Sequence, residues 1–235
     1  MITKKELKSI SSLRLKKNRK ELGQFVAEGT KTVEALIESG LAPSALYATQ
    51  ESDLHQVTLV GQKDMERMTL LKNASPMLGL FSIPSEPSLP TKGRVLVLDA
   101  IADPGNFGTI IRLCDWFGIE HILCSEDTVD CYNPKVVQAT MGSLARVYCH
   151  YTDLNTFLSQ SDLPIYGTFL EGESIYETSF PENAMLVLGS ESHGISPAIE
   201  ALVTCRVTIP RKVKQGPESL NVAIAGALTL GEFCQ

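Results

Sequence analysis

Short apolar segments alternate with helical segments through residues 94–235 of this chain. The apolar segments are rich in Val, Leu and Ile, and each is far shorter than a membrane-spanning helix requires. Strands of continuous apolar character, separated by helices, predict an α/β fold with a parallel sheet covered on both faces. The predicted strands are Val95–Leu98, His121–Cys124, Ala145–Cys149, Pro164–Phe169, Met185–Leu188 and Val207–Ile209, and the predicted helices are Asn106–Phe117, Pro134–Met141, Asp153–Ser159, Pro197–Val203 and Ser219–Phe233.

A proline-rich segment divides the chain into two predicted domains. Residues 82–93 contain three prolines, three serines and one glycine, a composition that resists both helix and sheet. We therefore predict a small N-terminal α/β domain at residues 1–84, a linker at 85–93 and a larger domain at 94–235.

The charge of the chain is distributed unevenly. The whole chain has a net charge of −6, with 21 Lys and Arg against 27 Asp and Glu. The first twenty residues, which include a predicted helix at about Lys4–Leu15, hold one acidic side chain, Glu6, and eight basic ones, namely Lys4, Lys5, Lys8, Arg14, Lys16, Lys17, Arg19 and Lys20. A basic end on an acidic body is typical of a protein that binds a polyanion, and a solvated lysine-rich helix is the alternative.

The six cysteines are scattered along the chain without a Cys-x-x-Cys pair, and several lie inside apolar segments. This pattern favours buried reduced thiols over a disulfide framework or a zinc site, so we expect no bound metal. The basic N-terminus is not followed by the apolar stretch of a secretory signal. Together these features predict a cytoplasmic protein with no membrane segment.

Three loops combine flexible backbone with polar side chains that no core requires. Asp103–Gly108 follows the strand at Val95–Leu98, Gly189–Gly194 follows the strand at Met185–Leu188, and Ser219–Val222 opens the last helix. Loops held by a rigid sheet are where α/β proteins build their sites. The candidate site residues on and beside these loops are Asn106, Arg112, Glu191, Ser219 and Asn221.

Each loop also has a plainer interpretation. Asn106 is a good N-cap for the helix that follows it, and Ser219 is a good N-cap for the last helix. Neither a phosphate-binding P-loop nor the Gly-x-Gly-x-x-Gly dinucleotide fingerprint is present. A serine hydrolase is disfavoured, because a nucleophile at Ser192 would need a later histidine and none follows His193.

Taken together, the three loops resemble the three motifs of the SpoU (TrmH-type) RNA 2′-O-ribose methyltransferases of the SPOUT class. The resemblance covers about residues 95–233, in the order and spacing of that family. Lys17-x-Arg19 leading to Gly23–Gly29 is similar to the opening of the family's N-terminal RNA-binding domain. The chain departs from the family pattern at Ser192, where Gly is usual, and at Arg211, where Met is common.

The resemblance implies a deep trefoil knot, a homodimer packed through the knotted domain, and S-adenosylmethionine as the methyl donor. It implies cofactor contacts at Gly189, Ile209 and Leu220, and it assigns the catalytic positions to Asn106, Arg112, Glu191, Ser219 and Asn221. The basic N-terminal segment supplies candidate RNA contacts at Lys16, Lys17, Arg19 and Lys20. An N-terminal α/β domain favours structured ribosomal RNA as the substrate, with transfer RNA, or a non-catalytic RNA-binding protein that kept the knot, as the alternatives.

Overall fold

The computed structural model describes residues 2–213 and 218–235. The chain forms two compact units, of which the first comprises residues 1–85 and 130–146 and the second comprises residues 86–129 and 147–235. Within the described ranges, no helix is long and apolar enough to cross a membrane.

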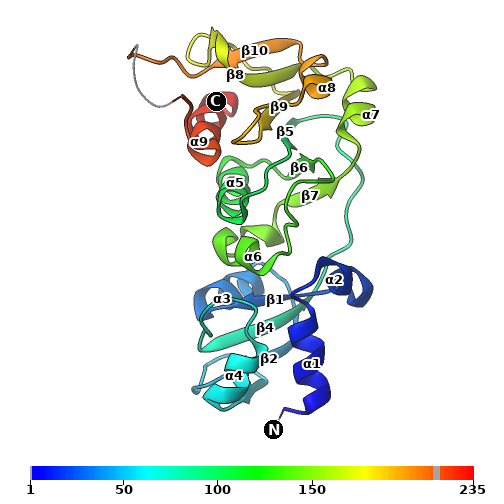
Figure 1. The fold of residues 1–235 in the computed structure, drawn as a ribbon, viewed down its shortest axis with the longest axis vertical. Helices are drawn as coiled ribbons and strands as arrows, with labels where there is room; N and C mark the ends of the chain where they lie inside the picture. The colour runs from blue at the N-terminus through cyan, green and yellow to red at the C-terminus, as the bar shows by residue number, and fades with distance from the viewer. Residues whose placement is uncertain (1, 214–217) are drawn as a thin grey trace. The chain divides into compact units, whose positions relative to one another are not determined.

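The first unit is built on a four-stranded mixed sheet in the order β1–β4–β2–β3 (Figure 1). β4 runs antiparallel to β1 and β2, and β2 runs parallel to β3. Side chains from the leading helix, Leu7 and Ile10, share a core with Val26 and Leu78 of the sheet and Met65 of a later helix. The elements are α1 (Lys4–Ser12), α2 (Lys16–Leu22), β1 (Gln24–Glu28), α3 (Thr30–Glu38), β2 (Pro43–Ala48), β3 (Val57–Leu59), α4 (Gln62–Met68) and β4 (Met77–Ser82).

The N-terminal helix predicted at about Lys4–Leu15 is two helices in the structure. Thr3 and Glu6 form a capping box that starts α1, and Leu15 is extended, with φ −92° and ψ 130°, before α2 begins. Leu13 is 1% exposed, so the chain turns where this side chain enters the core. Arg19 Nη1 donates to the backbone oxygens of Leu13 and Arg14 at 2.7 Å and 3.0 Å, which satisfies carbonyls that the end of α1 leaves free.

Residues 130–146 belong to the first unit, whereas the predicted division placed them in the domain at 94–235. They form α6 (Pro134–Thr140) and a short 3₁₀ turn at Ser143–Ala145. The Tyr132 ring lies 4.9 Å from the Phe25 ring of β1. A Cβ at Gly142, which has φ +94°, would lie 2.6 Å from Ala35 Cβ of α3. This packing also explains why the strand predicted from Ala145 begins only at Tyr148.

The second unit contains a six-stranded sheet in the order β10–β8–β9–β5–β6–β7. Every strand pair in it is parallel, which confirms the parallel sheet predicted from the apolar segments. The strands are β5 (Arg94–Asp99), β6 (His121–Cys124), β7 (Tyr148–Tyr151), β8 (Ile165–Ser174), β9 (Ala184–Gly189) and β10 (Cys205–Thr208).

Helices cover both faces of this sheet, as the alternating pattern predicted. α7 (Leu154–Ser159) and α8 (Pro197–Glu200) lie on one face, where Leu158 and Ile199 join a core with Val97 and Val187 of the central strands. α5 (Pro104–Phe117) and α9 (Val222–Phe233) lie side by side on the other face (Figure 1). Gly226 of α9 packs closely there, since a Cβ at this position would lie 3.1 Å from Leu188 Cδ1.

Candidate active site

The two central strands of the second unit end side by side. Asp99, the last residue of β5, is paired in register with Gly189, the last residue of β9. The loops that follow these strands therefore leave the sheet at the same edge, where open α/β sheets bind their ligands. They are the first two loops that the sequence singled out.

In the first loop, Asp103 caps α5, and the prediction that Asn106 is the cap was wrong. Asp103 Oδ1 accepts a hydrogen bond from the Asn106 backbone N–H at 2.8 Å, and Pro104 takes the first helical position. Asp is as good an N-cap as Asn, and proline favours the residue after the cap. The Asn106 side chain is consequently free for other contacts.

In the third loop, Asn221 caps α9, and the prediction that Ser219 is the cap was also wrong. Asn221 Oδ1 accepts hydrogen bonds from the backbone N–H groups of Ala223 at 3.0 Å and Ile224 at 3.3 Å. Ser219 lies outside the helix, and its side chain is exposed. The α9 N-terminus therefore fixes the oxygen side of the Asn221 amide.

Side chains from all three loops form one chain of hydrogen bonds, which we call the amide relay: Asn221, Asn106 and Glu191. Asn221 Nδ2 donates to Asn106 Oδ1 at 3.0 Å, and Asn106 Nδ2 donates to Glu191 Oε1 at 2.5 Å. The direction is determined by chemistry, because Asn221 uses its oxygen as the helix cap and must donate with its nitrogen. Asn106 then offers oxygen to Asn221 and nitrogen to the carboxylate.

The loop that carries Glu191 is a tight turn. The backbones of Ser190 and Gly194 exchange two hydrogen bonds, at 3.0 Å and 2.9 Å, and Gly194 has φ +69°. Gly189 leaves no room for a side chain, since a Cβ there would lie 2.1 Å from both the Gly194 carbonyl carbon and the Ile195 nitrogen. Glu191 therefore stands on a rigid support although its side chain is exposed.

The structure does not join Arg112 and Ser219 to the amide relay. Arg112 is exposed on α5, about 120° around the helix axis from Asn106. Over residues 2–213 and 218–235 it makes no ion pair and no hydrogen bond from its guanidinium. A guanidinium without a protein partner can bind an anion through two parallel hydrogen bonds.

The three residues predicted to contact a cofactor lie at the ends of elements in the second unit. Gly189 ends β9, Ile209 directly follows β10, and Leu220 directly precedes the α9 cap. Leu220 is 47% exposed, so an apolar side chain beside the amide relay is available to a ligand.

Arg19, predicted to contact RNA, is a buried residue in the structure. It is 3% exposed, and its guanidinium pairs with Asp130 through Nη2 and through Nε at 2.9 Å. Lys17 and Lys20 are exposed on the same helix, and Lys16 is half-buried. The Lys17 ammonium lies 3.8 Å from the Glu21 carboxylate, a surface pair that contributes little to stability.

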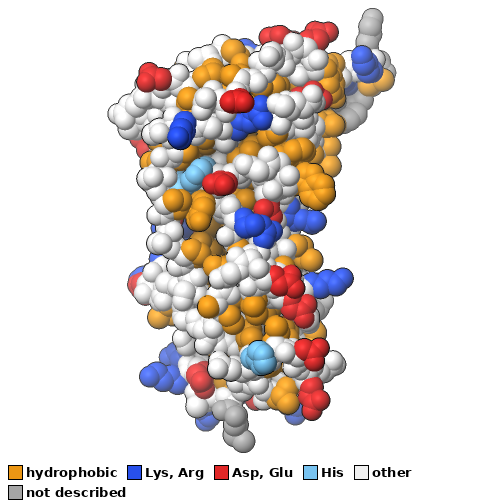
Figure 2. Space-filling view, turned by 180° about the vertical axis from the view of Figure 1, so that it is seen from behind, with side chains coloured by type: hydrophobic (Ala, Val, Ile, Leu, Met, Phe, Trp, Pro, Cys, Tyr) orange, Lys and Arg blue, Asp and Glu red, His pale blue; other side chains and the backbone are white. Residues whose placement is uncertain are grey.

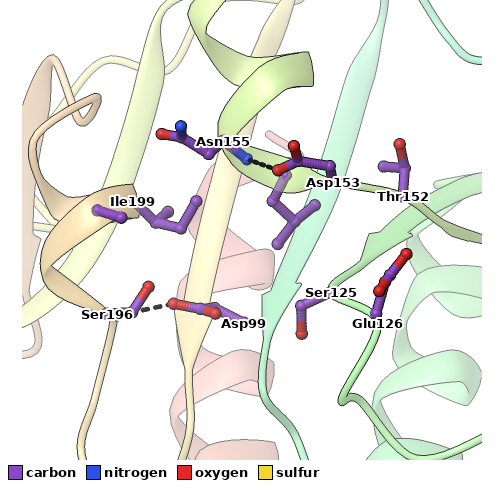
Figure 3. A pocket seen from close by; sticks show the side chains of 10 residues that line it. Asp99, Ser125, Glu126, Thr152, Asp153, Asn155, Ser196 and Ile199 are labelled. Carbon is purple, nitrogen blue, oxygen red and sulfur yellow. Dashed lines mark hydrogen bonds between the residues drawn. The ribbon is translucent and has the colours of Figure 1, made fainter.

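No sequence pattern predicts the pocket of about 400 Å³ that lies after β5, β6 and β7, beside α7 and α8 (Figure 3). None of the predicted site residues lines it. Two of its carboxylates already have backbone partners, since Asp99 accepts from Ser196 N–H at 2.7 Å and Asp153 caps α7. Hydrogen bonds from the hydroxyl and backbone of Thr156 hold the pKa of Asp153 below its usual value. The lining is Asp99, Ser125, Glu126, Thr152, Asp153, Leu154, Asn155, Ser196, Ala198 and Ile199.

Comparison with known protein families identifies the second unit's motifs. Residues 93–231 match the model described as the SpoU rRNA Methylase family. The chain belongs to this family. Residues 4–77 match a second model, the MRM3-like substrate binding domain. The family predicted from the three loops is thereby confirmed, and the predicted α/β fold class with a separate N-terminal domain is confirmed with it.

The similarity to known proteins of the SpoU family covers nearly the whole chain. The 23S rRNA (guanosine(2553)-2'-O)-methyltransferase RlmP of Bacillus subtilis is 27% identical over 234 residues, which cover 95% of this chain and 93% of RlmP. A solved structure from Porphyromonas gingivalis, assigned to the TrmH family of RNA methyltransferases, is 36% identical with a TM-score of 0.86, covering 99% of this chain and 98% of that one. The AdoMet-bound rRNA methyltransferase of Sinorhizobium meliloti is 26% identical with a TM-score of 0.84, covering 99% and 95%.

Proposed function

We propose that this protein transfers a methyl group from S-adenosylmethionine to a ribose 2′-hydroxyl of structured ribosomal RNA. The observation that carries the proposal is the amide relay, because it joins the three family motifs through the side chains of Asn221, Asn106 and Glu191. Membership of the SpoU rRNA methylase family and the likeness to RlmP support the same reaction. An intact relay favours an enzyme over a protein that only binds RNA.

The residues at the end of β9 and the start of α9 fit an adenosyl ligand. Gly189 places its backbone at the end of β9, and the exposed Leu220 offers an apolar surface for a purine or ribose face. We assign cofactor contacts to Gly189, Ile209 and Leu220. The chemistry supplied with the bound cofactor is a methyl group already activated on a sulfonium, so the protein's own residues have to align the hydroxyl and provide for its proton.

We assign Arg112 to the RNA phosphate next to the target ribose. A guanidinium keeps its proton, because its pKa lies above about 12, and it is therefore a poor general base. It can hold a phosphate in a fixed orientation and stabilise negative charge that develops on the ribose oxygen. That phosphate or a water molecule then accepts the hydroxyl proton.

The amide relay and Ser219 would position the ribose. The relay fixes the Asn106 and Asn221 amides in one orientation, so their polar atoms need no reorganisation when the RNA arrives. Ser219 is exposed two residues before Asn221 and can donate or accept a further hydrogen bond to the sugar. Glu191 terminates the relay and holds Asn106 in place.

We assign RNA binding to the first unit. It contains the match to the MRM3-like substrate binding domain, and it carries the exposed basic side chains of α1 and α2. The face of the molecule in Figure 2 shows acidic and basic side chains together, and neither sign covers it. Local basic groups such as Lys17 and Lys20, with Lys16 beside them, would attract the RNA backbone without reading its sequence.

The family's homodimer and trefoil knot remain part of the proposal. Large apolar side chains are exposed on the adjacent helices α5 and α9, with Trp116 at 84%, Ile224 at 55% and Leu228 at 39%. Exposed apolar groups of this size mark an interface, and a second copy of this chain is the partner that we propose. Trp116→Glu should shift the sedimentation coefficient from that of a dimer to that of a monomer, and a wild-type monomer would refute the dimer. We also propose the cytoplasmic location that the sequence predicts, and the six cysteines form no disulfide within the described residues.

Methyl transfer tests the proposed function directly. Purified protein is incubated with radiolabelled S-adenosylmethionine and either ribosomal RNA or transfer RNA, and 2′-O-methyl groups are mapped in the product. We expect label in ribosomal RNA, at a ribose. Label only in transfer RNA would overturn the substrate class, and label in neither RNA would refute the enzyme.

A further inference from the structure

Asp99 occupies the point where the first two site loops leave the sheet. It ends β5 opposite Gly189 of β9, and its side chain is buried, at 6% exposed. Its carboxylate points toward Ser196 (Figure 3), and Oδ2 accepts the Ser196 backbone N–H at 2.7 Å. A buried carboxylate outside the amide relay needs a structural or functional reason, because burial of a charge is costly.

The loop after Asp99 is fixed along its length. Ala100 adopts φ +58°, which is uncommon for a residue with a side chain, and its N–H donates to Ser125 Oγ at 2.8 Å. Four residues after Asp99, the Asp103 cap starts α5 and so sets the place of Asn106. The position of Asn106 thus depends on where β5 ends.

The loop after Gly189 is closed at its base by backbone hydrogen bonds. Ser190 and Gly194 close the turn, and Ile195 follows as a buried residue, at 5% exposed. Ser196 comes next, so the Asp99 carboxylate holds the returning end of this loop against the end of β5. Glu191 projects from the turn between these anchors.

We propose that Asp99 is a positioning residue that aligns Glu191 with Asn106. Two hydrogen bonds join the same two loops. Asp99 accepts one from the Ser196 N–H, and Asn106 donates the other to Glu191. The first bond lies at the buried base and sets the spacing in which the second forms at the exposed end. The bond is charge-assisted and uses the backbone of Ser196, so the Ser196 hydroxyl is not needed for it. The expected effect of this alignment on turnover rests on the proposed methyl transfer, whereas the alignment itself does not.

Three variants of the full-length protein test the inference by turnover. Asp99→Ala removes the acceptor, and we expect kcat for methyl transfer to fall about 100-fold, the effect of a displacement of about 1 Å. Asp99→Asn keeps an acceptor oxygen without the charge, so it should retain kcat within about 10-fold of the wild type. Ser196→Ala keeps the donating N–H and should leave kcat unchanged. If Asp99→Ala retains kcat within about three-fold of the wild type, the inference is refuted.

Hydrogen exchange separates positioning from general stability. In Asp99→Ala, amide exchange should accelerate in a peptide spanning residues 189–196 and stay unchanged in a peptide containing β6. Equal acceleration in both peptides would show a merely structural role and overturn the inference. If Asp99→Ala fails to fold, Asp99→Asn carries the test, with a smaller acceleration confined to the same peptide. If the wild type transfers no methyl group, the proposed function fails while the exchange pattern still decides the role of Asp99.

Discussion

Charged side chains of the first unit's motif are buried, whereas those at the loops of the second unit are exposed. In the first unit, Arg19 and Glu28 are each 3% exposed. The Arg19 guanidinium pairs with Asp130, and the Glu28 carboxylate accepts hydrogen bonds from the Thr69 hydroxyl and the Leu70 backbone N–H. In the second unit, Glu191 and Arg112 are exposed at or beside loops that end the central strands. The difference teaches that a polar residue of a sequence motif can be consumed by the fold, as Arg19 is, or left exposed for a ligand, as we propose for Arg112.

Energetics follow from that difference. A buried ion pair that loses one partner leaves an uncompensated charge in the interior, so stability falls. An exposed side chain can be replaced at little cost in stability, so its loss should affect rates. Replacing the buried ion pair of the first unit should therefore change the free energy of unfolding, and replacing exposed residues at the loops of the second unit should change turnover.

The largest effect is expected from Arg112→Ala. Loss of the guanidinium should lower the rate of methyl transfer by about 1,000-fold, because the developing charge loses its main electrostatic partner. The melting temperature and the affinity for S-adenosylmethionine should match those of the wild type. Arg112→Lys serves as the comparison and should not restore the rate, since an ammonium lacks the two-pronged geometry. Near-normal turnover by Arg112→Ala would remove Arg112 from the site.

Arg19→Ala should show the opposite behaviour. Its removal leaves Asp130 without its partner and two backbone oxygens without donors, so the free energy of unfolding should fall by about 3–5 kcal/mol. Denaturant titration measures the change. Lys20→Ala, an exposed position on the same helix, is the matched control and should stay within about 0.5 kcal/mol of the wild type. A drop of similar size in both variants would contradict the structural role of Arg19.

Asn221→Asp tests the amide relay without removing the α9 cap. Aspartate caps a helix as well as asparagine does, so the melting temperature should be retained. Asn106 would then face a carboxylate at each end of the relay and could donate to only one, so turnover should fall about 100-fold. Asn221→Ala should lose turnover and about 1 kcal/mol of stability together. Full activity in Asn221→Asp would show that the direction of the relay is irrelevant.

The smallest effects are expected from the exposed lysines of α2. Lys17→Ala and Lys20→Ala should each weaken RNA binding slightly and reduce the slope of log affinity against log salt by about one unit. Filter binding over a range of salt concentrations measures the slope. An unchanged slope in the double variant would place the RNA elsewhere on the molecule.

Much of the second unit follows from local patterns. Continuous apolar segments predict strands buried on both faces, and the strand at His121–Cys124 has the predicted bounds. The strand at Arg94–Asp99 extends the prediction by one residue at each end. Residue type alone does not predict where these helices start, because Asp103 and Asn106 are equally good N-caps, as are Ser219 and Asn221. Only the backbone path decided which of each pair accepts the helical N–H groups.

The sequence by itself determined the parallel sheet, the family, and the identity of the relay residues, because apolar periodicity and motif spacing are local properties. Only the tertiary structure decided that Asp130 partners Arg19 across 111 residues, that residues 130–146 join the first unit, and that Asp99 bonds the Ser196 backbone. Each of these outcomes is a contact between residues far apart in the sequence, made by a buried charged group or by a close-packed glycine. Burial and hydrogen-bond satisfaction in the folded chain select that partner, and no local pattern encodes the choice.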